Sequence, residues 1–256
     1  MKHFNEFVLS IYSYSKAISV ISKYHLYKYV FILVLLLLFF VVPVMLVGEA
    51  TTFISSYIPF LDGEKYARIG SEFFSSISGF FVLLVLIPIF TLVSDEVNYQ
   101  LRGVTNKFTI TQFVSDIFRG IKITLRNLIY QYVSIVIVLI LLSIFSSSIL
   151  FSLFGKLTIF TITSYFYGFS LMDYAMENYQ MNYKKSVQFT RSHIGLAIGL
   201  GAIYYMVISL NDLAIFKTIL GNLSVYWSAF AEAIVAFIGV IAANIVLHIV
   251  KKKNLS

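Results

Sequence analysis

Two long segments without a charged residue constrain this chain more than any other feature. Tyr29–Val47 has 19 uncharged residues and Phe73–Val93 has 21. At about 1.5 Å per residue, a helix of either length crosses the roughly 30 Å hydrocarbon layer of a bilayer. A small soluble domain has no room to bury two such segments completely. The sequence therefore predicts two membrane-spanning helices.

The composition indicates that little of the chain lies outside the bilayer. Charged residues make up 12% of it, about half of the ~25% typical of soluble domains. The longest stretches between apolar segments are roughly 25 to 35 residues, which rarely build a core of their own. We therefore predict an all-α, polytopic integral membrane protein that forms one membrane domain over residues 1–256.

The second half of the chain predicts two helical hairpins, 128–172 and 194–250. Gly155-Lys156 interrupts the first hairpin, and a polar stretch interrupts the second. Several arms are close to the lower length limit for spanning, so full crossing and partial-depth insertion both stay open. The predicted arms are Leu128–Phe154, Leu157–Met172, Ile194–Leu210 and Leu223–Val250.

Two further segments have the periodicity of amphipathic helices. Residues 4–24 repeat apolar side chains at three- and four-residue steps, which suits a helix in the membrane surface or one packed on its own bundle. Residues 109–127 form the amphipathic start of a long helix. Its basic stripe predicts either a positively charged mouth for an anion path or contact with lipid headgroups. That stripe consists of Arg119, Lys122 and Arg126.

The charge distribution predicts the orientation. Residues 1–28 hold four lysines and one glutamate, and residues 94–127 hold five basic and three acidic residues. The C-terminal tail adds three lysines, whereas residues 48–72 are net negative. Because basic residues gather on the cytoplasmic side, we expect both termini in the cytoplasm and the protein in a bacterial inner (plasma) membrane.

Two acidic residues are candidates for specific roles. Asp173 ends an apolar arm, where it can cap or fix the hairpin base by pairing with Lys184 or Arg191. Glu232 lies inside the last apolar arm, where an ionisable group is costly and often functional. It is either a proton-coupling carboxyl or an interfacial acid paired with Lys217.

Small residues mark the arm that begins at Ile194. Gly195 and Gly199 are four residues apart, which is a close-packing spacing. Together with Gly201 they predict either tight helix packing or a backbone cradle for an anion. No catalytic, metal or cofactor pattern appears, because the chain lacks cysteine and its four histidines are scattered. We therefore expect no enzyme activity, no cofactor and no nucleic-acid partner.

An ordered series of motifs resembles one known family. The series comprises Leu26–Tyr29, Leu92–Val97, Phe118–Asn127, Gly168–Tyr174 and Gly199–Gly201. In this order they are similar to the family that joins the bacterial sulfate permease CysZ to the eukaryotic etoposide-induced protein 2.4.

Two positions depart from the family pattern. Asp173-Tyr174 resembles the family's Asp-Tyr-Pro motif at the hairpin base, but Ala175 stands where the proline is expected. The family's Ile-Pro step reads Ile208-Ser209. The resemblance implies two spanning helices, partial-depth hairpins and, in CysZ-like members, sulfate uptake.

The expected function is therefore that of a permease or channel-like protein for a small oxyanion, with sulfate the first candidate. Helix N-termini near Leu157, Ile194 and Leu223 are candidate anion contacts, because they present free N–H groups and a positive dipole end. The alternative is a non-transporting scaffold that modulates partners or lipids. The lipid bilayer is the expected partner, and a second copy of the chain is a further candidate.

Overall fold

The described parts of the chain are helical. The computed structural model describes residues 1–36, 83–103, 109–144, 149–211 and 223–253, and no strand occurs within these ranges. Their main helices are α1 (Lys2–Lys23), α4 (Ile87–Arg102), α5 (Ile110–Ile144), α6 (Ile149–Asn178), α7 (Tyr183–Ser192), α8 (Ile194–Asn211) and α10 (Leu223–Lys253). Of the two predicted spans, residues 37–47 of 29–47 and residues 73–82 of 73–93 lie outside the described residues.

Several described helices can cross a membrane by length and composition. Ile110–Leu141 of α5 and Trp227–Lys252 of α10 do so as single helices. Two bent pairs qualify when each is taken as one broken span. In one, α1 meets the helical segment Tyr27–Leu36 at 100°, and in the other α7 meets α8 at 90°. The chain is thus an all-α membrane protein with two, or up to four, candidate spans in its described part.

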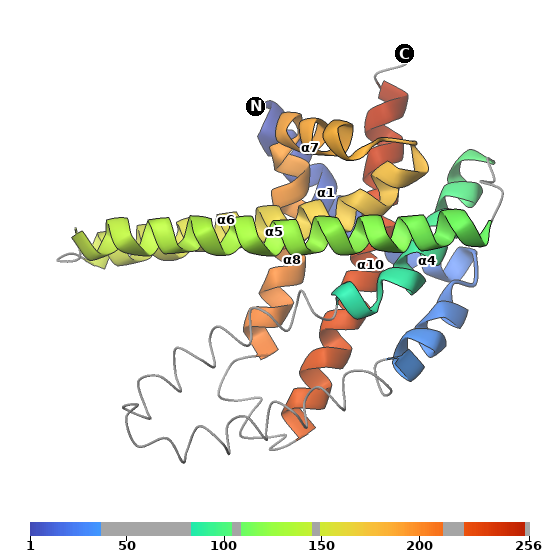
Figure 1. Ribbon diagram of the computed structural model, residues 1–256, viewed down its shortest axis with the longest axis horizontal. Helices are drawn as coiled ribbons and strands as arrows, with labels where there is room; N and C mark the ends of the chain where they lie inside the picture. The colour runs from blue at the N-terminus through green and yellow to red at the C-terminus, as the bar shows by residue number, and fades with distance from the viewer. Residues whose placement is uncertain (37–82, 104–108, 145–148, 212–222, 254–256) are drawn as a thin grey trace.

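The helices form two groups that cross each other (Figure 1). α5 and α6 run side by side, and one end of this pair projects beyond the other helices. α8 and α10 run across them at a steep angle, and the start of α1 and the end of α10 lie at one end of the molecule. Because two helices that cross steeply cannot both follow the membrane normal, at most one of these groups can run along it.

The predicted turn at Gly155-Lys156 is wrong. α6 runs without a break from Ile149 to Asn178, through both of these residues and past the predicted arm end at Met172. One glycine costs a helix only about 1 kcal/mol, and the exposed Lys156 side chain can point away from the bundle. Asp173 is consequently an internal helix residue, and it is not an end cap.

α1 packs on the bundle through small and polar side chains. Its buried residues lie against α8 and α10, with the Tyr14 hydroxyl donating to the Leu200 carbonyl at 2.7 Å. The buried set is Glu6, Ser10, Ser13, Tyr14 and Ala17. Much of the predicted apolar stripe is exposed instead, namely Phe4, Val8, Ile11 and Ile18. The helix therefore contacts the bundle on one side and presents apolar side chains on the other.

Glycines allow α8 to approach two neighbouring helices. A Cβ at Gly195 would lie 2.0 Å from the His3 carbonyl oxygen of α1, and one at Gly199 would lie 2.7 Å from the Phe7 carbonyl oxygen. A Cβ at Gly201 would likewise lie 2.6 Å from the backbone nitrogen of Gly168 in α6. These close approaches fit the packing interpretation of the small-residue spacing.

Candidate functional site

Arg119 of α5 joins the C-terminal part of α6 to α7. One terminal nitrogen contacts Asp173 Oδ1 and Ser186 Oγ, each at 2.8 Å, and the other donates to the Met181 carbonyl at 2.7 Å. The Asp173 side chain is only 5% exposed. The partner of Asp173 is thus Arg119, and the predicted pairing with Lys184 or Arg191 is wrong. Asp173 lies in the C-terminal part of α6, and the packing of α6 along α5 places it opposite Arg119.

Several acids surround this ion pair. Burial raises the pKa of Asp173, and the facing guanidinium of Arg119 opposes that rise. Burial, then hydrogen bonding with Asp116, raises the pKa of Glu177 well above its ordinary value. Burial and the charge of Asp116 raise the pKa of Asp95 to about 6. Each of these shifts favours the neutral form of the carboxyl, so this side of the cluster is acidic but only partly charged.

Arg126 occupies a different environment on the next turns of α5. Its guanidinium carbon lies 5.2 Å from the Tyr130 ring centroid, 5.2 Å from that of Phe169 and 5.3 Å from that of Tyr183. The Lys122 ammonium lies 5.6 Å from the Tyr183 centroid. Arg126 Nη1 is buried and has no hydrogen-bond acceptor among the described residues. The predicted basic stripe therefore divides into a paired arginine and two cations that share aromatic contacts.

A second polar network holds α4, α6 and α10 together. The Ser94 hydroxyl donates to the Tyr174 carbonyl at 3.0 Å, and it accepts from the amides of Asn178 at 2.8 Å and Asn244 at 2.9 Å. The Tyr174 ring packs edge-on against Phe90, with the centroids 5.6 Å apart. Tyr174 therefore belongs to a buried contact that fixes the region next to Asp173.

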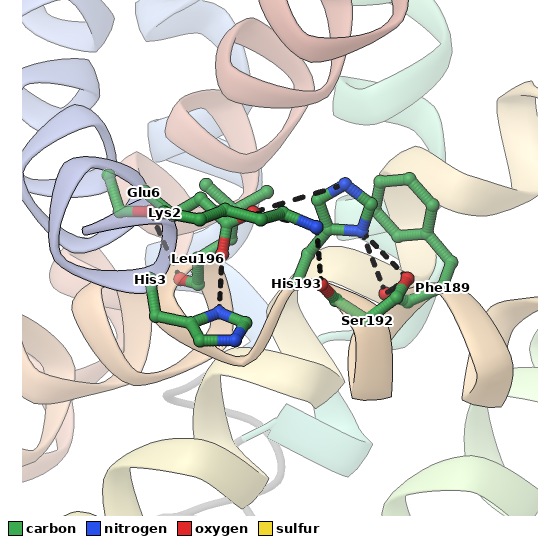
Figure 2. A network of polar contacts seen from close by, with 8 residues as sticks. Lys2, His3, Glu6, Phe189, Ser192, His193 and Leu196 are labelled. Atoms are coloured by element: carbon green, nitrogen blue, oxygen red, sulfur yellow. Dashed lines mark hydrogen bonds and ion pairs between the residues drawn. The ribbon is translucent and has the colours of Figure 1, made fainter.

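A third polar cluster joins the start of α1 to the α7–α8 bend (Figure 2). His3 Nδ1 lies 3.1 Å from Glu6 Oε2, and His193 Nε2 lies 4.0 Å from Glu6 Oε1. Lys2 donates to the Ser192 carbonyl at 3.0 Å, and its Nζ lies 3.8 Å from Glu6 Oε1. This buried carboxylate ties the N-terminal turn of α1 to the bend.

Two of the three helix N-termini that the sequence predicts as anion contacts are not available in the structure. Leu157 lies inside α6, so no helix begins there. The N-terminus of α8, at Ile194, is covered by α1, whose Glu6 Cβ would lie 2.9 Å from a Cβ at Gly195. An acid at a helix N-terminus already interacts with the positive end of the dipole. The third end, Leu223, follows residues outside the described part of the chain.

Glu232 is buried within α10. Glu232 is 2% exposed, and the Ser228 hydroxyl donates to its Oε1 at 2.9 Å. Tyr204 of α8 lies within electrostatic range of this carboxyl. Lys217, the predicted partner, lies outside the described residues. Glu232 therefore lies at the interface between α8 and α10. It is far in the sequence from Arg119, Lys122 and Arg126 of α5.

The sequence interpretation missed several members of these clusters. Asp116, Glu177 and Ser186 complete the surroundings of the Arg119–Asp173 pair, and Glu6 organises the third cluster. Asp116 gave a usable signal, since it stands one helical turn before Arg119 on the same helix. The others come from separate helices, and no local spacing relates them to α5.

The fold and the buried charge clusters define a helical integral membrane protein with polar interfaces between its helices. The profile of one family, described as sulfate transporter CysZ/etoposide-induced protein 2.4, matches residues 7–217. The chain therefore belongs to the CysZ/etoposide-induced protein 2.4 family. Among curated proteins, no relative matches the chain.

Proposed function

We propose that this chain is a membrane permease or channel-like protein for a small oxyanion, with sulfate the first candidate. The family carries the transport assignment. The observation in the structure that supports an anion is the buried Arg126 Nη1, which has no acceptor among the described residues, with Lys122 on the same tyrosine ring and beside the acid-paired Arg119. A dianion loses strong hydration on leaving water, so fixed cations with free donors favour its passage.

The test of transport is uptake of radiolabelled sulfate by proteoliposomes that contain the full chain. We expect uptake above that of protein-free liposomes, and we expect excess unlabelled sulfate to suppress it more than excess chloride does. Protein recovered from the same liposomes must run as one monodisperse species. Uptake equal to the protein-free control would favour the alternative of a non-transporting scaffold.

We propose that the protein lies in the bacterial inner (plasma) membrane, with both termini in the cytoplasm. The basic N-terminal segment and tail support this orientation, and the start of α1 and the end of α10 lie at one end of the molecule (Figure 1). We expect a C-terminal tag to resist protease added outside intact spheroplasts and to be cleaved after lysis. Cleavage before lysis would contradict the orientation.

A further inference from the structure

We infer that Arg126, assisted by Lys122, is the residue that contacts the oxyanion, and that Arg119 has a structural role at the α5–α6–α7 junction. This inference rests on the proposed function and deepens it. It divides three basic residues that occupy one stripe of α5 into two roles.

Arg119 is already engaged by the protein. Its terminal nitrogens are occupied by Asp173, Ser186 and the Met181 carbonyl at 2.7–2.8 Å. Its Nε has no acceptor among the described residues, but the charge is neutralised by a carboxylate that is itself buried. An anion that approached Arg119 would have to displace Asp173 and open the α5–α6–α7 junction.

Arg126 has the opposite character. Within the described residues no carboxylate lies within ion-pair distance of it. The Asp173 carboxyl lies within electrostatic range of Arg126, but it is bound to Arg119. The rings of Tyr130, Phe169 and Tyr183 surround the guanidinium and fix its direction, while leaving its charge in place. The buried Nη1 lacks an acceptor in the described part of the chain. A planar guanidinium held in this way suits a tetrahedral oxyanion, which can accept two parallel hydrogen bonds.

Lys122 adds a second positive charge to the same location. It precedes Arg126 by one helical turn, and both cations contact the ring of Tyr183. Arg191 of α7 and Arg126 also both lie within electrostatic range of Tyr165. This density of positive charge suits a doubly charged oxyanion better than chloride. Free sulfate and a lipid phosphate share this chemistry, so the test must separate them.

The test measures the midpoint of thermal unfolding of the full chain in an uncharged detergent as sodium sulfate replaces sodium chloride at constant ionic strength. We expect sulfate to raise the wild-type midpoint. We expect Arg126→Gln to weaken sulfate binding about 10- to 100-fold, because one charge-assisted contact is lost. The matched control is Lys16→Gln, which removes an exposed lysine that also stacks on a tyrosine, and it should bind sulfate as the wild type does.

Two further variants test the sulfate contact even if Arg126→Gln does not fold. Lys122→Gln changes an exposed residue and should weaken sulfate binding several-fold, by loss of one nearby charge. Arg119→Lys should lower the midpoint without sulfate and yet retain the wild-type sulfate affinity. Wild-type sulfate affinity in both Arg126→Gln and Lys122→Gln, no sulfate shift in the wild type, or loss of sulfate binding in Arg119→Lys alone would each overturn the assignment.

A second arm replaces sulfate by phosphatidylglycerol in the same detergent. Stabilisation by this lipid that depends on Arg126, without any effect of sulfate, would assign the site to a headgroup and overturn its role as substrate contact. The proposed function fails separately, through absence of uptake in wild-type proteoliposomes. Normal uptake by folded Arg126→Gln would instead leave the function standing and remove this assignment.

Discussion

Asp173→Asn is expected to reduce the yield of folded protein strongly and to lower the free energy of unfolding by about 3–5 kcal/mol, the usual cost of breaking a buried ion pair from one side. The asparagine removes the charge that faces Arg119 at 2.8 Å, and the guanidinium then stays partly buried among α5, α6 and α7 without a counter-charge. The measurement is the monodisperse fraction after solubilisation, together with the unfolding midpoint in detergent.

A double-mutant cycle separates the pair from its surroundings. Arg119→Gln should also destabilise the protein, and Arg119→Gln combined with Asp173→Asn should cost less than the sum of the two single changes, since neither charge is then left alone. The fraction of Asp173→Asn that folds should transport at a rate per molecule near that of the wild type. Normal yield with abolished uptake would show that Asp173 acts in transport and not in folding.

The second large effect is expected at the crossing of α6 and α8. A Cβ at Gly168 would lie 1.8 Å from the Ala197 carbonyl oxygen, and a Cβ at Gly201 would lie 1.8 Å from the Ser164 carbonyl oxygen. Because the obstructing atoms are backbone, a rotamer change cannot relieve either contact and the helices must separate. Gly168→Ala and Gly201→Ala should each cost about 3 kcal/mol, at the upper end of overpacking effects.

Gly120→Ala is the matched control for this crossing. Its Cβ would lie 3.1 Å from Ile87 Cγ2, a side-chain atom that can move, and alanine is the better helix former. Its unfolding midpoint should therefore stay close to that of the wild type. Equal losses in all three variants would indicate a general intolerance of alanine and would contradict the tight α6–α8 crossing.

The sequence was sufficient for the parts of the fold that depend on local pattern. Apolar length and charge distribution predicted a helical membrane protein, and the starts of α8 at Ile194 and α10 at Leu223 agree with the structure. The spacing of Gly195 and Gly199 corresponds to real close approaches to α1. Each of these features is encoded within one segment of the chain.

Other features depend on contacts between distant segments, which composition cannot encode. Gly155-Lys156 has the sequence of a turn, but α6 continues through it. Arg119 and Asp173 are 54 positions apart, and only the return of α6 alongside α5 brings them together. The aromatic surroundings of Arg126 likewise require the convergence of Phe169 and Tyr183 from two other elements.

The most direct test of the central claim is sulfate influx into proteoliposomes, expressed per folded molecule and compared with protein-free liposomes of the same lipid. A permease should give saturable influx well above the protein-free value, reduced by excess unlabelled sulfate. Influx by folded, correctly inserted protein that equals the protein-free value would contradict the assignment of oxyanion transport.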